Sequence, residues 1–133
     1  MKRLKYVSQF ASDMDRAAID AMIARAEKHN AASGITGILM SSGRMFYQVI
    51  EGPEEAIDAL FGRIEADPRH QDVLLLDVES GVTERIFADW SLRKIDLDAR
   101  ADRRLEPIRE LLVAVVDHRL LLDRLTHALE RAL

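Results

Sequence analysis

The side chains that could do chemistry are few and widely spaced along the chain. The four histidines, at 29, 70, 118 and 127, do not share one predicted element at metal-ligand spacing. The sequence has no cysteine, which excludes disulfides, thiolate catalysis and zinc–thiolate sites. It also lacks a phosphate-binding loop, a nucleophile elbow and an H-E-x-x-H motif. Residue spacing alone therefore indicates an α+β domain with a helical tail, and we do not expect an enzyme.

The composition is that of an ordinary soluble domain. Of the 133 residues, 48% are hydrophobic and 32% are charged, which is enough for one buried core. The formal net charge of -4 argues against nucleic-acid binding, which normally needs a basic face. The first residues have positive charges with no apolar run after them, and no segment has the roughly 18 apolar residues that span a bilayer. We therefore expect a cytoplasmic protein that binds no membrane.

The elements that must position any site alternate along the first 96 residues. In chain order, the patterns predict a strand at 4–8, a helix through 18–26 that stops near 29–30, strands at 35–40 and 45–50, a helix at 54–66, and strands at 73–78 and 85–95. The first six elements have the order of a split βαβ unit. We expect an α+β fold with a ferredoxin-like sheet, two helices on one face of the sheet, and a C-terminal helical extension.

Residues 97–133 are predicted to form that extension, after a domain of residues 1–96. Apolar side chains recur there in alternating steps of three and four, at positions called the apolar seam: Ile108, Leu111, Val115, His118, Leu122, Leu125, Leu129 and Ala132. A second apolar stripe lies beside the seam, so we expect burial against both the chain's own sheet and another chain. Two short helices with a break near 117–118 would satisfy the pattern equally well. We expect a homodimer, or a larger homo-oligomer, through residues 105–133.

Five short motifs occur in order along these elements. They are LKYVS at 4–8, HN at 29–30 running into GITG at 34–37, FYQVIEG at 46–52, DPRH at 67–70 and FADWSL at 87–92. Together they resemble the BLUF family of blue-light sensors that use FAD, and the resemblance covers roughly residues 1–96. It implies a ferredoxin-like sheet with the flavin ring held between the two helices.

The resemblance implies roles for three polar side chains. Tyr6 would be the electron donor to the photoexcited flavin, and Gln48 would pass hydrogen bonds between Tyr6 and the N5/O4 edge of the ring. Asn30 would hold the carbonyl and N3 edge. Because a carboxamide has a donor and an acceptor on one planar group, Gln48 could relay the phenolic proton and then rest in a rotated or tautomeric state. A new hydrogen bond to the C4 carbonyl would shift the absorption to the red.

Five more positions would bind the cofactor by the same resemblance. Met22 occupies a ring-sandwiching position where the family often has isoleucine, and Ile64 lies on the apolar face of the second helix. Asp67, Arg69 and His70 would line the ribityl chain and the rest of the cofactor's tail. FAD is the default cofactor, and FMN is the alternative because the family binds the ring and phosphate more than the adenine.

The last motif would transfer the signal to a protein effector through the last strand and the C-terminal helices. Trp90 and Leu92 would act there, and Leu92 stands where the family usually has methionine, which bears on the strength or speed of transfer. One alternative is the sensor module of a light-regulated nucleotide cyclase, which the segments at 1–4, 95–97 and 107–108 resemble. Another is a ferredoxin-like enzyme or small-ligand-binding domain without flavin, since fold alone does not decide function.

Overall fold

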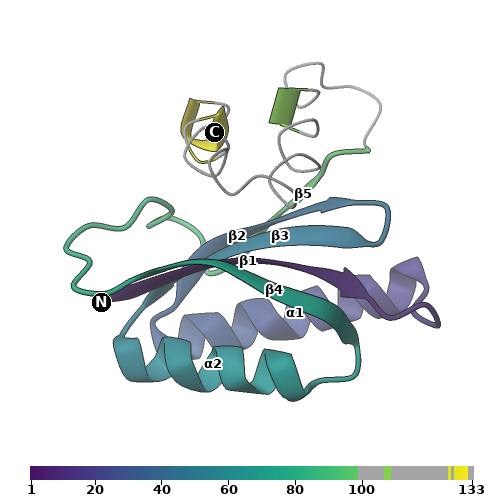
Figure 1. The fold of residues 1–133 in the computed structure, drawn as a ribbon, viewed down its shortest axis with the longest axis horizontal. Helices are drawn as coiled ribbons and strands as arrows, with labels where there is room; N and C mark the ends of the chain where they lie inside the picture. Colours follow the sequence, from purple (N-terminus) through teal and green to yellow (C-terminus); the bar gives the residue numbers. More distant parts are fainter. Residues whose placement is uncertain (99–106, 109–125, 127, 132–133) are drawn as a thin grey trace.

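Seven helices and strands are defined in the computed structural model, which describes residues 1–98, 107–108, 126 and 128–131. In chain order they are β1 (Lys2–Phe10), α1 (Arg16–Ser33), β2 (Thr36–Ser42), β3 (Met45–Gly52), α2 (Glu54–Ala66), β4 (His70–Glu79) and β5 (Arg93–Asp96). The strands form one sheet in the order β4-β1-β3-β2-β5, with β5 parallel to β2 and the other pairs antiparallel. Both helices cover the same face of the sheet (Figure 1). The predicted α+β, ferredoxin-like fold is confirmed.

Helix α1 begins and ends on identifiable caps. The Asp15 carboxylate accepts a hydrogen bond from the Ala18 N–H at 2.8 Å, which satisfies one free amide of the first turn. At the other end Gly34 is left-handed, with φ 70°, and its N–H bonds to the Asn30 carbonyl. The helix therefore runs to Ser33, past the end predicted near 29–30, and Asn30 lies in its last turn. Neither α1 nor any other described helix combines the length and the apolar character that a membrane crossing needs.

Side chains on each strand alternate between the two faces of the sheet. On β1, Leu4 and Tyr6 pack with residues of the helices, among them Ile57 and Ile64. Val7 packs in a separate core on the opposite side, here called the far face. The same division holds for β2, β3 and β4, whereas β5 contributes only Ile95, to the far-face core.

The strand predicted at 85–95 is wrong over most of its length, because β5 spans only Arg93–Asp96. Residues before β5 form an irregular segment at the edge of the molecule (Figure 1). The Glu51 carboxylate accepts hydrogen bonds from the N–H groups of Ile86 and Phe87, at 2.9 and 3.2 Å. These amides bond to a side chain and not to a neighbouring strand, which is why an apolar, alternating sequence does not become a strand here.

The described part of the C-terminal segment lies over the far face (Figure 1). Ile108 and Leu129, two residues of the apolar seam, are 1% and 0% exposed and pack in the far-face core. At these two positions the seam is buried against the chain's own sheet. The rest of the seam lies outside the described residues, so the dimer through 105–133 and the domain boundary after residue 96 stay predictions.

Gly37, on β2, tests how tightly the central strands pack. A Cβ atom added there would lie 2.1 Å from the Val49 carbonyl oxygen on β3, which is backbone and cannot swing away. We expect Gly37→Ala to lower the free energy of unfolding by roughly 1–3 kcal/mol, as overpacking does. Gly62, in α2, is the control: a Cβ there meets nothing within 4 Å, and Gly62→Ala should raise stability by about 0.5–1 kcal/mol. Urea unfolding measures both, and an unchanged midpoint for Gly37→Ala would contradict the close approach.

Candidate functional site

A groove between α1 and α2 leads toward the sheet. Its outer part is a pocket of about 240 Å³, and its inner part is a cavity of about 60 Å³. Five residues line both parts: Met22, Ala26, Leu60, Ile64 and His70. The inner cavity also reaches Gln48 on β3 and Leu92. A concave, mainly apolar site with a few polar groups is typical of a small-molecule ligand site.

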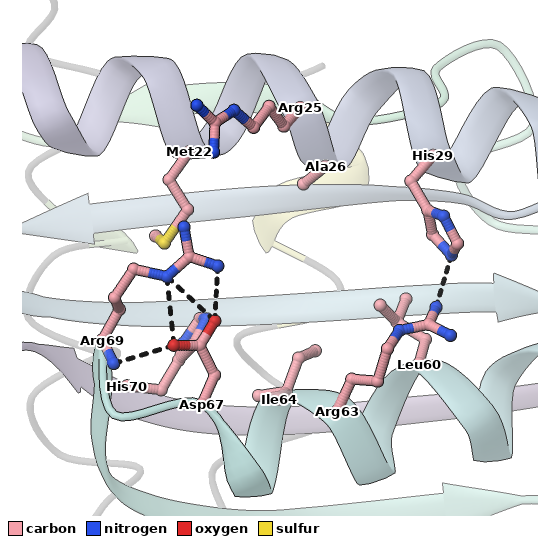
Figure 2. Close-up of a pocket in the computed structure, with 10 residues that line it drawn as sticks. All are labelled: Met22, Arg25, Ala26, His29, Leu60, Arg63, Ile64, Asp67, Arg69 and His70. Atoms are coloured by element: carbon pink, nitrogen blue, oxygen red, sulfur yellow. Dashed lines mark hydrogen bonds and ion pairs between the residues drawn. The ribbon is translucent and has the colours of Figure 1, made fainter.

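The helix residues that line the outer pocket come from one stripe on each helix. They are at 22, 25, 26 and 29 on α1 and at 60, 63 and 64 on α2, with 67 at the C-cap of α2, which are the i, i+3, i+4, i+7 positions of a helix face. Figure 2 shows these two stripes facing each other across the pocket. Sequence reasoning had singled out Met22, Ile64 and Asp67 and missed the other five: Arg25, Ala26, His29, Leu60 and Arg63. Their helical spacing from the three predicted residues is the signal that could have found them.

Tyr6 and Gln48 meet on neighbouring strands below the groove. They are register partners on β1 and β3, and the Tyr6 hydroxyl donates a hydrogen bond to the Gln48 side-chain carbonyl. Tyr6 is 0% and Gln48 is 5% exposed. Burial raises the pKa of Tyr6 far above its ordinary value, so the phenol keeps its proton and acts as the donor. Gln48 lines the inner cavity, whereas Tyr6 lines neither the cavity nor the outer pocket.

Two buried polar atoms at the inner cavity lack a hydrogen-bond partner within the described part of the chain. They are Asn30 Oδ1 and His70 Nδ1. The Asn30 amide nitrogen donates to the Ser91 carbonyl at 2.9 Å, which orients the side chain and leaves its oxygen without a donor. A buried polar group without a partner costs about 1–3 kcal/mol. A ligand or water that enters this cavity could supply the missing hydrogen bonds.

The mouth of the groove is rich in cationic side chains. Arg69 holds Asp67 through Nε, at 2.9 and 3.0 Å, and through a terminal nitrogen at 2.5 Å (Figure 2). This guanidinium lowers the pKa of Asp67, so the carboxyl is ionised and neutralises one charge. Arg63 contacts the His29 ring across the pocket, and Arg25 lines the same mouth from α1. The lining of the outer pocket thus has three guanidinium groups and one carboxylate, a balance that suits an anionic ligand group such as phosphate.

The two residues predicted to transfer the signal lie on opposite faces of the sheet. Leu92 is buried and lines the inner cavity together with Gln48. Trp90 packs against the far-face core, and the Arg93 guanidinium carbon lies 4.6 Å from the centroid of its ring. Leu92, and not Trp90, is therefore the one that shares the cavity with Gln48.

The buried His70 ring makes the free energy of unfolding depend on pH. Burial lowers the pKa of its ring below the ordinary value; Asp67 opposes this shift and Arg69 adds to it. As the pH falls through about 6.5, the unfolded chain takes up a proton that the folded protein resists, so stability is present above that pH and is lost below it.

We therefore expect the free energy of unfolding to fall between pH 8 and about pH 5.5, and to fall less in His70→Gln than in the wild type. Urea titrations at several pH values measure the slope. Carboxylates titrate in both proteins, so only the difference between the two slopes reports on His70. Parallel slopes would show that His70 is not held in its neutral form.

Comparison with known proteins agrees with this geometry. The family model "BLUF: Sensors of blue-light using FAD" matches residues 1–93. The photoactivated adenylate cyclase subunit beta of Euglena longa is 34% identical over 109 residues, which cover 74% of this chain and 12% of that protein. This chain thus spans only a small part of the cyclase subunit it matches.

Two solved structures extend the likeness to three dimensions. BlrB, a BLUF protein solved in its dark state, superposes with a TM-score of 0.78 at 34% identity, covering 99% of this chain and 96% of that one. A bacterial light-regulated adenylyl cyclase superposes with a TM-score of 0.81 at 30% identity, covering 92% of this chain and 36% of that one. The resemblance carried by the five motifs is confirmed: the chain belongs to the BLUF family of flavin-binding blue-light sensors.

Proposed function

We propose that the chain senses blue light through a hydrogen-bond switch between Tyr6 and Gln48, driven by a flavin bound in the groove between α1 and α2. The observation that supports this best is the buried hydrogen bond from the Tyr6 hydroxyl to the Gln48 carbonyl, directly beside the inner cavity. Membership in a flavin-binding family argues against the alternative of a ferredoxin-like domain without flavin.

The residues present fit a flavin. Asn30 Oδ1 can accept a hydrogen bond from the imide N–H of the ring, and His70 Nδ1 is a second unmet polar atom at the same cavity. Met22 and Ile64 offer apolar contacts from opposite helices. The inner cavity alone is smaller than a tricyclic ring, so the ligand would also occupy the outer pocket.

A bound flavin supplies the absorption of blue light and an acceptor for one electron. Tyr6 is the donor in this proposal: it gives up one electron and its hydroxyl proton, and the proton moves along the hydrogen bond toward Gln48. Because burial raises the pKa of Tyr6, the phenol does not lose its proton in the dark, and proton loss has to accompany oxidation. The electron and the proton then return, so the phenol ends unchanged.

Gln48 supplies the two states of the switch. In the structure its carbonyl accepts from Tyr6. A planar amide has an acceptor and a donor side, so after a half-turn the nitrogen would donate to the Tyr6 oxygen and the carbonyl would face the cavity. Leu92, beside Gln48, has no polar atom in its side chain and favours neither orientation by hydrogen bonding. The equilibrium between the two orientations of the Gln48 amide would then be set by Tyr6 and the ligand alone.

We further propose that the ligand carries phosphate, with FAD the default and FMN the alternative. Arg25, Arg63 and Arg69 at the mouth of the groove are the residues that would hold it. The isoalloxazine is the same in both cofactors, so these arginines, and not the inner cavity, would recognise the phosphorylated tail.

A second candidate, favoured by the likeness to the cyclases, is that this sensor controls a catalytic domain. In either case the output is a contact made by the C-terminal segment, with a homodimer through 105–133 as one form of it. Ile108 and Leu129 pack against the chain's own sheet, so a partner chain would contact other residues of the apolar seam.

Gln48→Leu tests the switch. Leucine is similar in size and has no donor or acceptor, so we expect the light-induced redshift of the flavin to be lost completely while flavin binding persists. Light-minus-dark absorption spectra measure this. Gln9→Leu, at an exposed position on β1, is the matched control and should keep the full shift. A normal redshift in Gln48→Leu would refute the role of the carboxamide.

Arg25→Gln tests recognition of the phosphate. We expect it to weaken FAD and FMN binding roughly two- to fivefold, the range of an exposed ion pair, and to leave riboflavin binding unchanged. Fluorescence titration of the flavin-depleted protein gives the three affinities. Arg16→Gln is the control, since Arg16 is on the same helix and pairs with Asp96 at 3.5 Å, away from the groove. Equal losses for all three flavins would mean that Arg25 does not contact phosphate.

A further inference from the structure

The chain neighbours of Tyr6 and Gln48 project through the sheet to its far face. Strand side chains alternate, so Lys5 precedes Tyr6 and Tyr47 precedes Gln48 on the side away from the groove. Tyr47 packs in the far-face core, under the C-terminal segment. One side of each strand thus holds the switch residue, and the other side holds its immediate neighbour.

Lys5 is a buried cation on this face. It is 3% exposed, and its Nζ lies 3.4 Å from Thr126 Oγ1 and 4.0 Å from a carboxylate oxygen of both Asp77 and Glu79. A buried ammonium needs hydrogen-bond partners. Asp77 and Glu79 belong to the same sheet, whereas Thr126 belongs to the C-terminal segment, 121 residues further along the chain.

Tyr47 has a second buried polar group on this face. Burial raises the pKa of its hydroxyl, and a hydrogen-bonding influence of Thr126 opposes the shift. The buried hydroxyl nevertheless has no hydrogen-bond partner among the residues described. Tyr47 therefore has a buried hydroxyl with an unsatisfied hydrogen-bonding capacity on the same face as the bond from Lys5 Nζ to Thr126 Oγ1, which is long at 3.4 Å.

We propose that Lys5, Tyr47 and Thr126 form a polar contact through which the rearrangement of Tyr6 and Gln48 reaches the C-terminal segment. The inference rests on the proposed switch but uses a route across the sheet, and not along the strand β5. Its three members are here called the far-face triad.

The physical basis is that a shift of the β1 and β3 backbones moves side chains on both faces of the sheet. Tyr6 pairs with Gln48 and Val7 pairs with Tyr47 in the same β1–β3 ladder, so a change in the Tyr6–Gln48 bond that displaces the strands also displaces Lys5 and Tyr47. Packed interiors transmit such shifts because they hold few voids. A hydroxyl can accept two hydrogen bonds and donate one. Thr126 Oγ1 can therefore accept from Tyr47 as well as from Lys5. In this proposal the displacement of the two strands decides which of the two bonds is the shorter, and this gives the C-terminal segment two positions.

Thr126→Val and Lys5→Met test the triad in the full chain loaded with flavin. Both substitutions keep the approximate shape and remove the polar contact. We expect each to leave the redshift at wild-type size and to reduce, at least threefold, the light-induced change in hydrogen exchange of a C-terminal peptide that contains Thr126. The double variant should show no larger loss than either single variant, because the two changes remove one contact.

Lys2→Met is the matched control. Lys2 is on the same strand but pairs with Asp58 on α2 at 2.6 Å, on the helix side, and its loss should leave both readouts at wild-type values. Should Lys5→Met fail to fold, Thr126→Val tests the same contact from the other side. A wild-type exchange response in Thr126→Val, or no light response in the wild-type peptide despite a redshift, would overturn the triad. Absence of a redshift in the wild type would instead overturn the proposed switch.

Discussion

The site depends on one buried hydrogen bond, from the Tyr6 hydroxyl to the Gln48 carbonyl. It exists because β1 and β3 pair antiparallel in a register that sets these two residues directly opposite each other. Phe46 and Phe61 meet the Tyr6 ring edge-on, from the sheet and from α2, and help to hold it away from water. A phenol in that setting keeps its proton and has a single direction in which to donate. A neighbouring amide with a donor and an acceptor side is what the proposed two-state switch requires.

Strand β3, which carries Gln48, also positions the irregular segment before β5. Glu51, three residues after Gln48, is fully buried and accepts a hydrogen bond from Arg3 Nε at 2.8 Å. It also accepts the backbone N–H groups of Ile86 and Phe87. A buried carboxylate is tolerable only with such partners. These bonds, together with the bond from Asn30 to Ser91, hold the segment where Leu92 lines the inner cavity.

A single sheet can therefore serve two environments. The helix-covered face holds an apolar groove with a few unmet polar atoms, as a ligand site requires. The far face is covered by the C-terminal segment at Ile108 and Leu129 and contains the buried Lys5. Because successive strand residues point to opposite faces, the groove on one side and the described part of the C-terminal segment on the other are contacted by residues one peptide unit apart.

The sequence by itself determined the elements up to β4, the stripe of α2 and the five motifs that mark the family. Those features are local: helical and strand periodicity report which face of an element is buried, and α2 was predicted at 54–66, where it occurs. Only the tertiary structure decided what depends on distant partners. The pattern at 85–92 predicted a strand, but in the fold the Glu51 carboxylate accepts the N–H groups of Ile86 and Phe87. The pattern also could not distinguish Leu92, which lines the cavity, from Trp90, which packs on the far face. The meeting of Lys5 with Thr126 was equally hidden, because a pattern records burial but not which distant group a buried side chain contacts.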